Sequence, residues 1–134
     1  MNALVSRPGF LRAVLSVDAA TSGAMGLLLI GAAGLLAPML GLPDVLLRVA
    51  GFALLPFALF VFVVARSASP AATAVWIVVA LNLAWVFESA WLLAGDFVAP
   101  TALGVAFVAG QAIAVAILAT LEIVGLRARR LAAS

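Results

Sequence analysis

The stretch from Phe97 to Leu121, FVAPTALGVAFVAGQAIAVAILATL, contains no charged side chain and decides the class of fold. The hydrocarbon core of a bilayer is about 30 Å thick, so a helix that rises about 1.5 Å per residue needs roughly 20 apolar residues to cross it. A membrane β-barrel would instead alternate apolar and polar residues along each strand, which this stretch does not do. The stretch therefore predicts a transmembrane helix.

Three further charge-free runs follow the same logic, Ala19–Pro43, Val49–Ala65 and Ser67–Phe87. Glycines and prolines at positions 41, 43, 70, 95 and 100 lie at the joints between the predicted helices, and both residue types mark the ends of helices. The connecting loops are short, so neighbouring helices are expected to run antiparallel in an up-down bundle. We therefore predict an all-α integral membrane protein with one domain over residues 1–134 and four transmembrane helices over residues 11–37, 45–65, 71–94 and 101–126.

The composition excludes a water-soluble domain. Hydrophobic residues make up 68% of the chain and charged residues 9%, against about 45–50% and 25% in a typical soluble domain. The sequence contains no His, Cys, Lys or Tyr. Thiolate nucleophiles, zinc sites of the usual kind, histidine-ligated haem, Schiff bases and serine–histidine catalysis are therefore ruled out. We expect no enzyme activity, no metal and no cofactor.

The arginines predict the orientation in the membrane. All seven basic residues are arginines, and in a four-span arrangement only Arg48 lies on one side. Since positive residues accumulate in cytoplasmic segments, both termini are expected in the cytoplasm. The high pI of 11.2 then indicates contact with anionic lipid headgroups, not nucleic acid. The six arginines on the cytoplasmic side are Arg7, Arg12, Arg66, Arg127, Arg129 and Arg130.

The use of arginine without lysine, in a chain rich in Ala, Gly and Val, is typical of a GC-rich bacterial genome. The expected location is therefore the bacterial cytoplasmic (inner) membrane, which the chain crosses several times. The lipid bilayer is the first expected partner.

Polar residues inside the predicted spans are candidate functional residues. An ionisable side chain near the bilayer centre costs about 2.5–3.5 kcal/mol on insertion scales, so it usually faces the bundle interior and pairs. Counting along the predicted helices gives three layers. Asp18 and Glu122 lie in the cytoplasmic half, Asn82 and Gln111 near the middle, and Arg48 and Glu88 in the outer half.

Depth and helical facing predict one contact in the outer layer, an ion pair between Glu88 and Arg48. Glu88 lies about 9 Å below the expected outer boundary, counted at about 1.5 Å per residue, and glutamate is too short to reach the surface from there. For Arg48 a structural alternative stays open, because its long side chain can extend to the outer headgroups.

In the other two layers, Asn82 and Gln111 are expected to hydrogen-bond at mid-depth, and Asp18 and Glu122 to approach each other near the inner surface. Interhelical polar contacts of this kind average only about 0.6 kcal/mol and select helix register more than they add stability. The cations expected to neutralise the two acidic groups are Arg12, Arg66 and Arg127.

Two functional classes stay open from the sequence. The first is a non-catalytic accessory or assembly subunit that packs against a larger membrane complex or lipid. Small residues at four-residue spacing, such as Ala106, Gly110 and Ala114, let helix backbones approach and favour this class. The second is an oligomeric transporter or channel whose buried carboxylates bind a proton, a cation or a small solute. We expect the first class, with a membrane protein or a second copy of the chain as partner.

Overall fold

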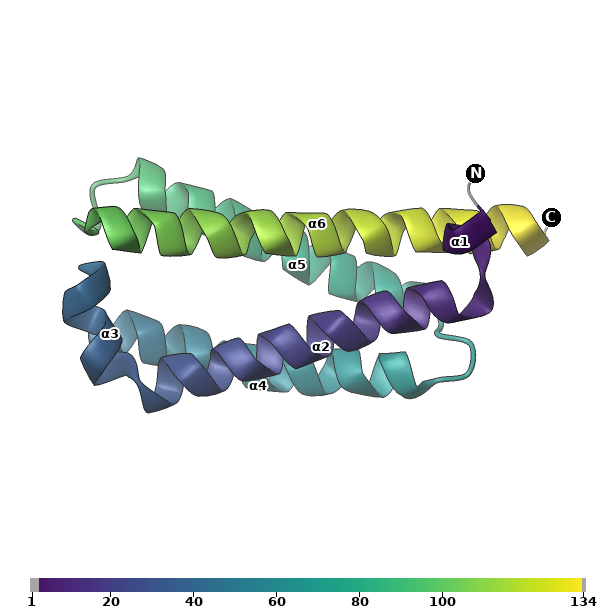
Figure 1. Ribbon diagram of the computed structural model, residues 1–134, viewed down its shortest axis with the longest axis horizontal. Coiled ribbons are helices and arrows are strands. Elements are labelled where there is room, and N and C mark those ends of the chain that lie inside the picture. The colour runs from purple at the N-terminus through teal and green to yellow at the C-terminus, as the bar shows by residue number, and fades with distance from the viewer. Residues whose placement is uncertain (1–2, 134) are drawn as a thin grey trace.

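The computed structural model describes residues 3–133, which are helical apart from short connections. Within these residues, four helices are long and apolar enough to cross a membrane, as the sequence predicts. Figure 1 shows them side by side along the long axis of the molecule. The helices are α1 (Ala3–Ser6), α2 (Pro8–Gly31), α3 (Ala33–Leu40), α4 (Asp44–Arg66), α5 (Ala72–Ala94) and α6 (Ala102–Ala133).

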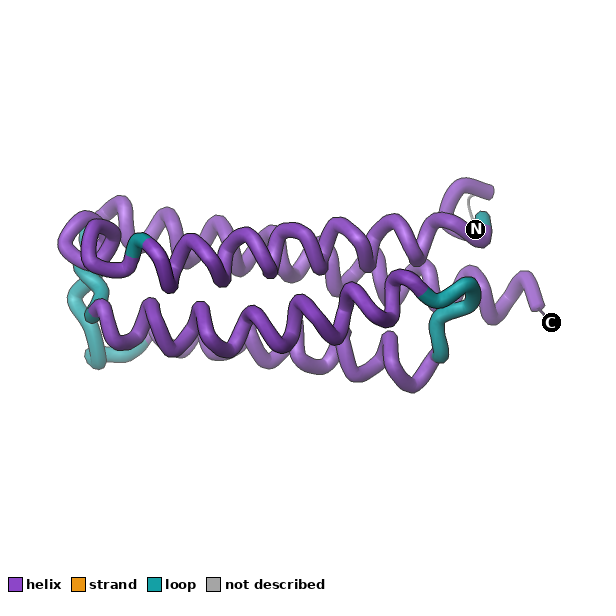
Figure 2. Tube along the Cα trace, turned by 90° about the horizontal axis from the view of Figure 1, so that it is seen from below, coloured by secondary structure: helices purple, strands orange, loops and turns teal. Residues whose placement is uncertain are grey.

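The four long helices alternate in direction, and both described ends of the chain lie at the same end of the molecule (Figures 1 and 2). Helix α2 packs most extensively against α4, and α5 packs against α6. Contacts between α2 and α6 join these two pairs, whereas α4 and α5 scarcely touch. The bundle is therefore two helix pairs joined mainly through α2 and α6.

Two glycines explain why α2 and α4 approach so closely. A Cβ atom at Gly51 would lie only 2.8 Å from the carbonyl oxygen of Gly26, and a Cβ at Gly26 would lie 3.1 Å from that of Gly51. Because neither residue has a side chain, the two backbones meet directly. Such contacts between small residues are a main source of helix association in membranes.

The first predicted helix, over residues 11–37, is wrong in extent. Helix α2 begins earlier, at Pro8, because proline fits the first turn of a helix. It ends at Gly31, and Ala32, with φ −117° and ψ 16°, separates it from α3. Glycine costs a helix about 1 kcal/mol relative to alanine, so Gly31 and Gly34 on either side of Ala32 favour a break here.

The end of the bundle opposite the termini is closed by contacts between α3 and the start of α6. Gly41 ends α3 with φ 67°, a conformation that glycine adopts without strain. The backbone N–H of Thr101 donates to the Leu40 carbonyl at 3.0 Å, and its hydroxyl donates to the Met39 carbonyl at 2.8 Å. The same hydroxyl accepts from the Gly104 N–H at 3.1 Å and so caps α6.

Helix α6 continues to Ala133, beyond the predicted end at residue 126. The arginines that mark the edge of the membrane do not end the helix, because arginine is a good helix former. Cations near the last turn also interact favourably with the negative end of the helix dipole.

Apolar side chains fill the bundle in two clusters, one toward each end. The cluster near the termini includes Leu15, Val61 and Val78, and the opposite cluster includes Leu29, Leu54 and Val108. Large apolar side chains also cover much of the outer surface, as expected for helices that face lipid. Three buried polar side chains, Asp18 on α2, Asn82 on α5 and Glu122 on α6, lie near or between these clusters along their helices.

Candidate functional site

Three polar side chains from three helices meet in the interior, Asp18 of α2, Asn82 of α5 and Glu122 of α6. Their exposed fractions are 1%, 3% and 0%. The side-chain nitrogen of Asn82 donates to Asp18 Oδ2 at 2.8 Å and to Glu122 Oε1 at 3.0 Å. One amide thus bridges two carboxylates, and we call these residues the acidic cluster.

The two remaining carboxylate oxygens of the acidic cluster differ in whether they accept a hydrogen bond. The Ser22 hydroxyl, one turn along α2, donates to Asp18 Oδ1 at 3.2 Å. Glu122 Oε2 is buried and has no hydrogen-bond partner among the described residues. Since an amide nitrogen has two hydrogens, Asn82 has none left to offer this oxygen. The cluster therefore contains more acceptors than donors.

No cation compensates this cluster within residues 3–133, where the ion pair between Asp44 and Arg48 is the only one formed. Instead of turning inward, Arg12 donates through Nε to the Ala65 carbonyl at 3.2 Å. Two carboxylates held on one donor away from water carry a large desolvation cost. The arrangement is therefore suited to holding a positive charge, as a proton or a small cation, between Asp18 and Glu122.

A second polar group, the amide cluster, lies further along the α5–α6 interface and consists of Trp85, Ser89 and Gln111. The Trp85 indole N–H donates to Gln111 Oε1 at 2.6 Å. Gln111 Nε2 donates to Ser89 Oγ at 3.0 Å and to the Val108 carbonyl at 2.8 Å. The Ser89 hydroxyl donates to the Trp85 carbonyl at 2.8 Å. These bonds use both hydrogens of the Gln111 amide.

The predicted contact between Asn82 and Gln111 is replaced by these two separate clusters. Asp18 lies near the middle of α2, because this helix begins earlier and ends earlier than predicted, and Asn82 lies near the middle of α5. Asp18 and Glu122 do lie together, through Asn82, but away from the arginines that were expected to neutralise them.

The predicted ion pair between Arg48 and Glu88 does not form. Arg48 instead pairs with Asp44, one turn earlier on α4, at 3.8 Å, with both side chains about half exposed. Glu88 is exposed on the outer surface of α5. The reason lies in the packing, because α4 and α5 scarcely touch and Arg48 has an acidic neighbour on its own helix.

Sequence reasoning left Ser22, Trp85 and Ser89 out of the candidate site. Helical spacing carries the signal that finds them, since residues four apart lie on one face. Ser22 follows Asp18 by one turn, and Ser89 follows Trp85 by one turn. Trp85 adds an indole N–H that donates to Gln111 of the neighbouring helix.

No protein-family model, no curated protein and no solved structure matches this chain.

Proposed function

We propose that the chain is a multi-pass protein of the bacterial inner membrane that serves as a non-catalytic subunit, packed against a larger membrane complex. The observation that carries this proposal is Glu88, a carboxylate exposed on the outside of a helix long and apolar enough to cross a membrane. A charge in that position needs a partner, and residues 3–133 do not supply one.

The position of Glu88 makes lipid an unsuitable neighbour. It lies six residues before Ala94, the last residue of α5, or about 9 Å along the helix at about 1.5 Å per residue. Within the described part of the chain it forms no ion pair, and no other interaction of its side chain is recorded. Ionisable side chains in membranes almost always pair with another polar group. The expected neighbour is a helix of another protein that presents a cation or a hydrogen-bond donor at this depth.

Aromatic rings next to Glu88 support a protein contact on this face. Phe87 and Trp91 are exposed to 66% and 59%, and their ring centroids lie 6.1 Å apart. Trp91 also stacks on Phe97, with 6.2 Å between ring centroids. Aromatic side chains are enriched in protein interfaces because they bury a large area at low cost in conformational entropy.

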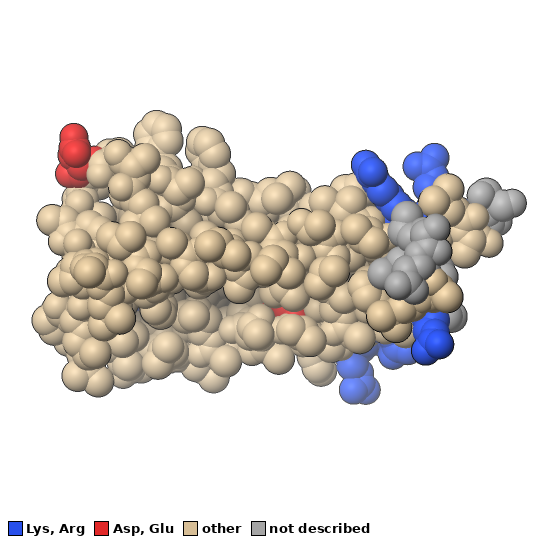
Figure 3. All heavy atoms as spheres, turned by 45° about the horizontal axis from the view of Figure 1, so that its top comes forward, with Lys and Arg blue, Asp and Glu red and all other residues tan. Residues whose placement is uncertain are grey.

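The distribution of arginines supports an orientation with both termini in the cytoplasm. In Figure 3 the basic side chains gather at the end of the molecule that carries the termini, and acidic side chains are visible at the opposite end. The positive-inside rule assigns the arginine-rich end to the cytoplasm. Glu88 then lies in the outer half of the membrane.

The test is to purify the tagged protein from its native membrane in mild detergent, as wild type, Glu88→Gln and Asp96→Asn. Asp96 is an exposed acidic residue in the loop after α5, so it is a matched control for loss of one carboxylate on the same side. We expect a larger membrane protein to co-purify in stoichiometric amount with the wild type and the control but not with Glu88→Gln. A clean homo-oligomer, or a partner retained equally by all three, would contradict the proposal.

A second candidate function is binding and transfer of a proton or small cation, and the acidic cluster favours it. Asp18 and Glu122 share one amide, and Glu122 Oε2 has no partner among the described residues. In liposomes, a carrier of this kind would show ion-driven flux that Asp18→Asn and Glu122→Gln abolish. Glu88→Gln serves as the control that leaves the flux unchanged. Equal flux in all variants would remove the carboxylate mechanism.

A further inference from the structure

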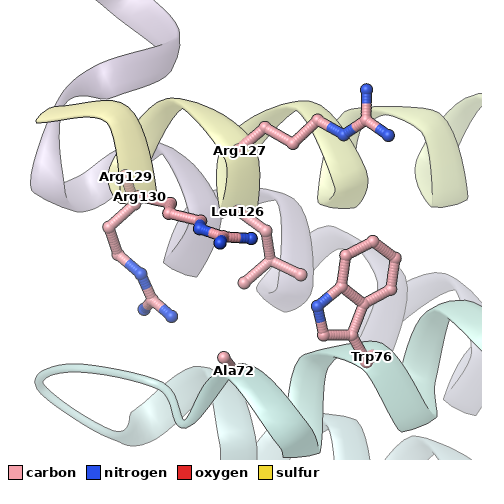
Figure 4. A pocket seen from close by; sticks show the side chains of 6 residues that line it. All are labelled: Ala72, Trp76, Leu126, Arg127, Arg129 and Arg130. Carbon is pink, nitrogen blue, oxygen red and sulfur yellow. The ribbon is translucent and has the colours of Figure 1, made fainter. Parts of the chain in front are cut away.

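A pocket of about 520 Å³ lies between the first two turns of α5 and the last turns of α6, at the arginine-rich end of the molecule. Figure 4 shows it from close by. Neither the acidic cluster nor Glu88 belongs to it. Its lining residues are Ala72, Trp76, Leu126, Arg127, Arg129 and Arg130.

Three arginines line the pocket on the α6 side, although most of its surface is apolar. Arg127, Arg129 and Arg130 all line it, and its lining among the described residues includes no carboxylate. In Figure 4 the side chains of Arg129 and Arg130 extend from α6 into the space in front of Ala72. Nη1 of Arg129 donates to the Pro70 carbonyl at 2.7 Å, which fixes this side chain over the start of α5. A guanidinium has five N–H groups, so others are left for a ligand.

The α5 side of the pocket adds positive potential. The N-cap residue Ala71 makes no side-chain hydrogen bond to the first turn of the helix. The first N–H groups of a helix have no partner within the helix and form the positive end of its dipole. Ala72, the first residue of α5, lines the pocket. Arginine side chains and the first residue of an uncapped helix therefore line the same space, a combination that suits a phosphate group.

An apolar wall adjoins this cationic space. Trp76 is 45% exposed and, with Leu126, completes the lining on the side that faces the middle of the molecule. Tryptophan prefers the level of the headgroups in a membrane, where its ring is partly apolar and its N–H is polar. A ligand that fits both parts has a phosphate attached to an apolar or weakly polar body.

We propose that this pocket binds the phosphate group of an anionic phospholipid, with the glycerol and upper acyl chains against Trp76 and Leu126. The inference rests on one part of the proposed function, namely that α5 and α6 cross the membrane with their arginine-rich end in the cytoplasm. It does not depend on a partner at Glu88.

The test compares lipid binding by the wild type and two double variants in delipidated detergent solution. Arg127→Gln with Arg130→Gln removes the charges of two arginines that line the pocket and keeps the hydrogen bond between Arg129 and Pro70. Arg7→Gln with Arg66→Gln removes two exposed charges at the same end, outside the pocket. The probes are phosphatidylglycerol, phosphatidylcholine and inorganic phosphate, and native mass spectrometry counts the bound lipids.

We expect the wild type to retain phosphatidylglycerol in preference to phosphatidylcholine. An arginine near a charged membrane surface contributes a factor of about five in affinity, so the pocket variant should bind phosphatidylglycerol on the order of 20-fold more weakly. The control variant should bind it within about twofold of the wild type, since its arginines do not line the pocket.

Three results would overturn the proposal. Equal losses in both double variants would assign the effect to diffuse surface charge. Unchanged binding in the pocket variant would exclude the pocket. Binding of inorganic phosphate without preference between the two lipids would assign the site to free phosphate. Resistance of the protein to alkaline extraction from membranes, measured on the same preparations, keeps a failure of lipid binding distinct from a failure of the membrane location itself.

Discussion

The acidic cluster joins α2, α5 and α6, the amide cluster joins α5 and α6 alone, and the two differ in the balance of donors and acceptors. In the amide cluster every hydrogen of the Gln111 amide meets an acceptor, and the carbonyl oxygen of Gln111 accepts the Trp85 indole N–H. In the acidic cluster two carboxylates share the hydrogens of one amide, and Glu122 Oε2 stays without a partner among the described residues.

This difference matters for the cost of burying each cluster. A balanced group of buried hydrogen bonds fixes the register of two helices and needs nothing further. A group with surplus acceptors is costly to bury unless a positive charge accompanies it. The amide cluster therefore has the character of a packing contact, and the acidic cluster that of a binding site.

The largest expected effect follows from replacing Asn82 with Leu. This substitution removes the only amide that bridges Asp18 and Glu122 and leaves both carboxylates buried. A hydrogen bond to a charged group contributes about 1.5–3 kcal/mol, and Asn82 makes two of them, so the loss is about 3–6 kcal/mol. The free energy of unfolding, measured by titration with sodium dodecyl sulfate in mixed micelles, should fall by this amount. A fall below about 1 kcal/mol would show that the two clusters are energetically alike.

A smaller loss is expected for Gln111→Leu. The substitution leaves the Trp85 indole N–H and the Ser89 hydroxyl with fewer partners, but it leaves no buried charge. Interhelical hydrogen bonds in membranes contribute about 0.6 kcal/mol on average and about 1.7 at most. The same unfolding titration should give a loss in this range. A loss equal to that of Asn82→Leu would contradict the distinction between the clusters.

The smallest effect, with the opposite sign, is expected for Glu122→Gln. The new amide removes one buried carboxylate and brings donors to a place where acceptors are in surplus. A hydrogen bond gained in this way contributes about 0.5–1.5 kcal/mol, so the variant should be slightly more stable than the wild type. The control is Glu88→Gln, which lies outside the cluster. A destabilised Glu122→Gln would mean that the wild-type cluster already holds its positive charge firmly.

The spans were predictable from the sequence because lipid imposes a simple requirement. A run such as Phe97–Leu121 has to satisfy its backbone internally and expose apolar side chains, and a helix does both. The break at Ala32 and the extension of α6 through Arg127 were not predictable in the same way. Apolar composition indicates where a segment leaves the membrane. The end of a helix depends instead on backbone conformation and on packing.

The polar residues could be chosen from the sequence, but their partners could not. Any polar side chain within an apolar run stands out, which is how Asp18, Asn82 and Glu122 were found. The hydrogen-bond or ion-pair partner of a side chain depends on which helices are neighbours. The sequence does not show that α4 and α5 make few contacts with each other. An ion pair between Arg48 and Glu88 needed that contact, and Asp44 was available to Arg48 on its own helix.

The backbone contact between Gly26 and Gly51 also determines which parts of the bundle can separate. At these glycines the two backbones touch and the side chains of Ile30, Leu54 and Leu55 pack around them, so sliding or separating the helices disrupts the whole contact. Helices α4 and α5 contact each other far less than α2 and α4 do. A motion that opens the interior to water would therefore move the α5–α6 pair away from α4. Helices α2 and α4, which are joined at their glycines, would stay together as one rigid body.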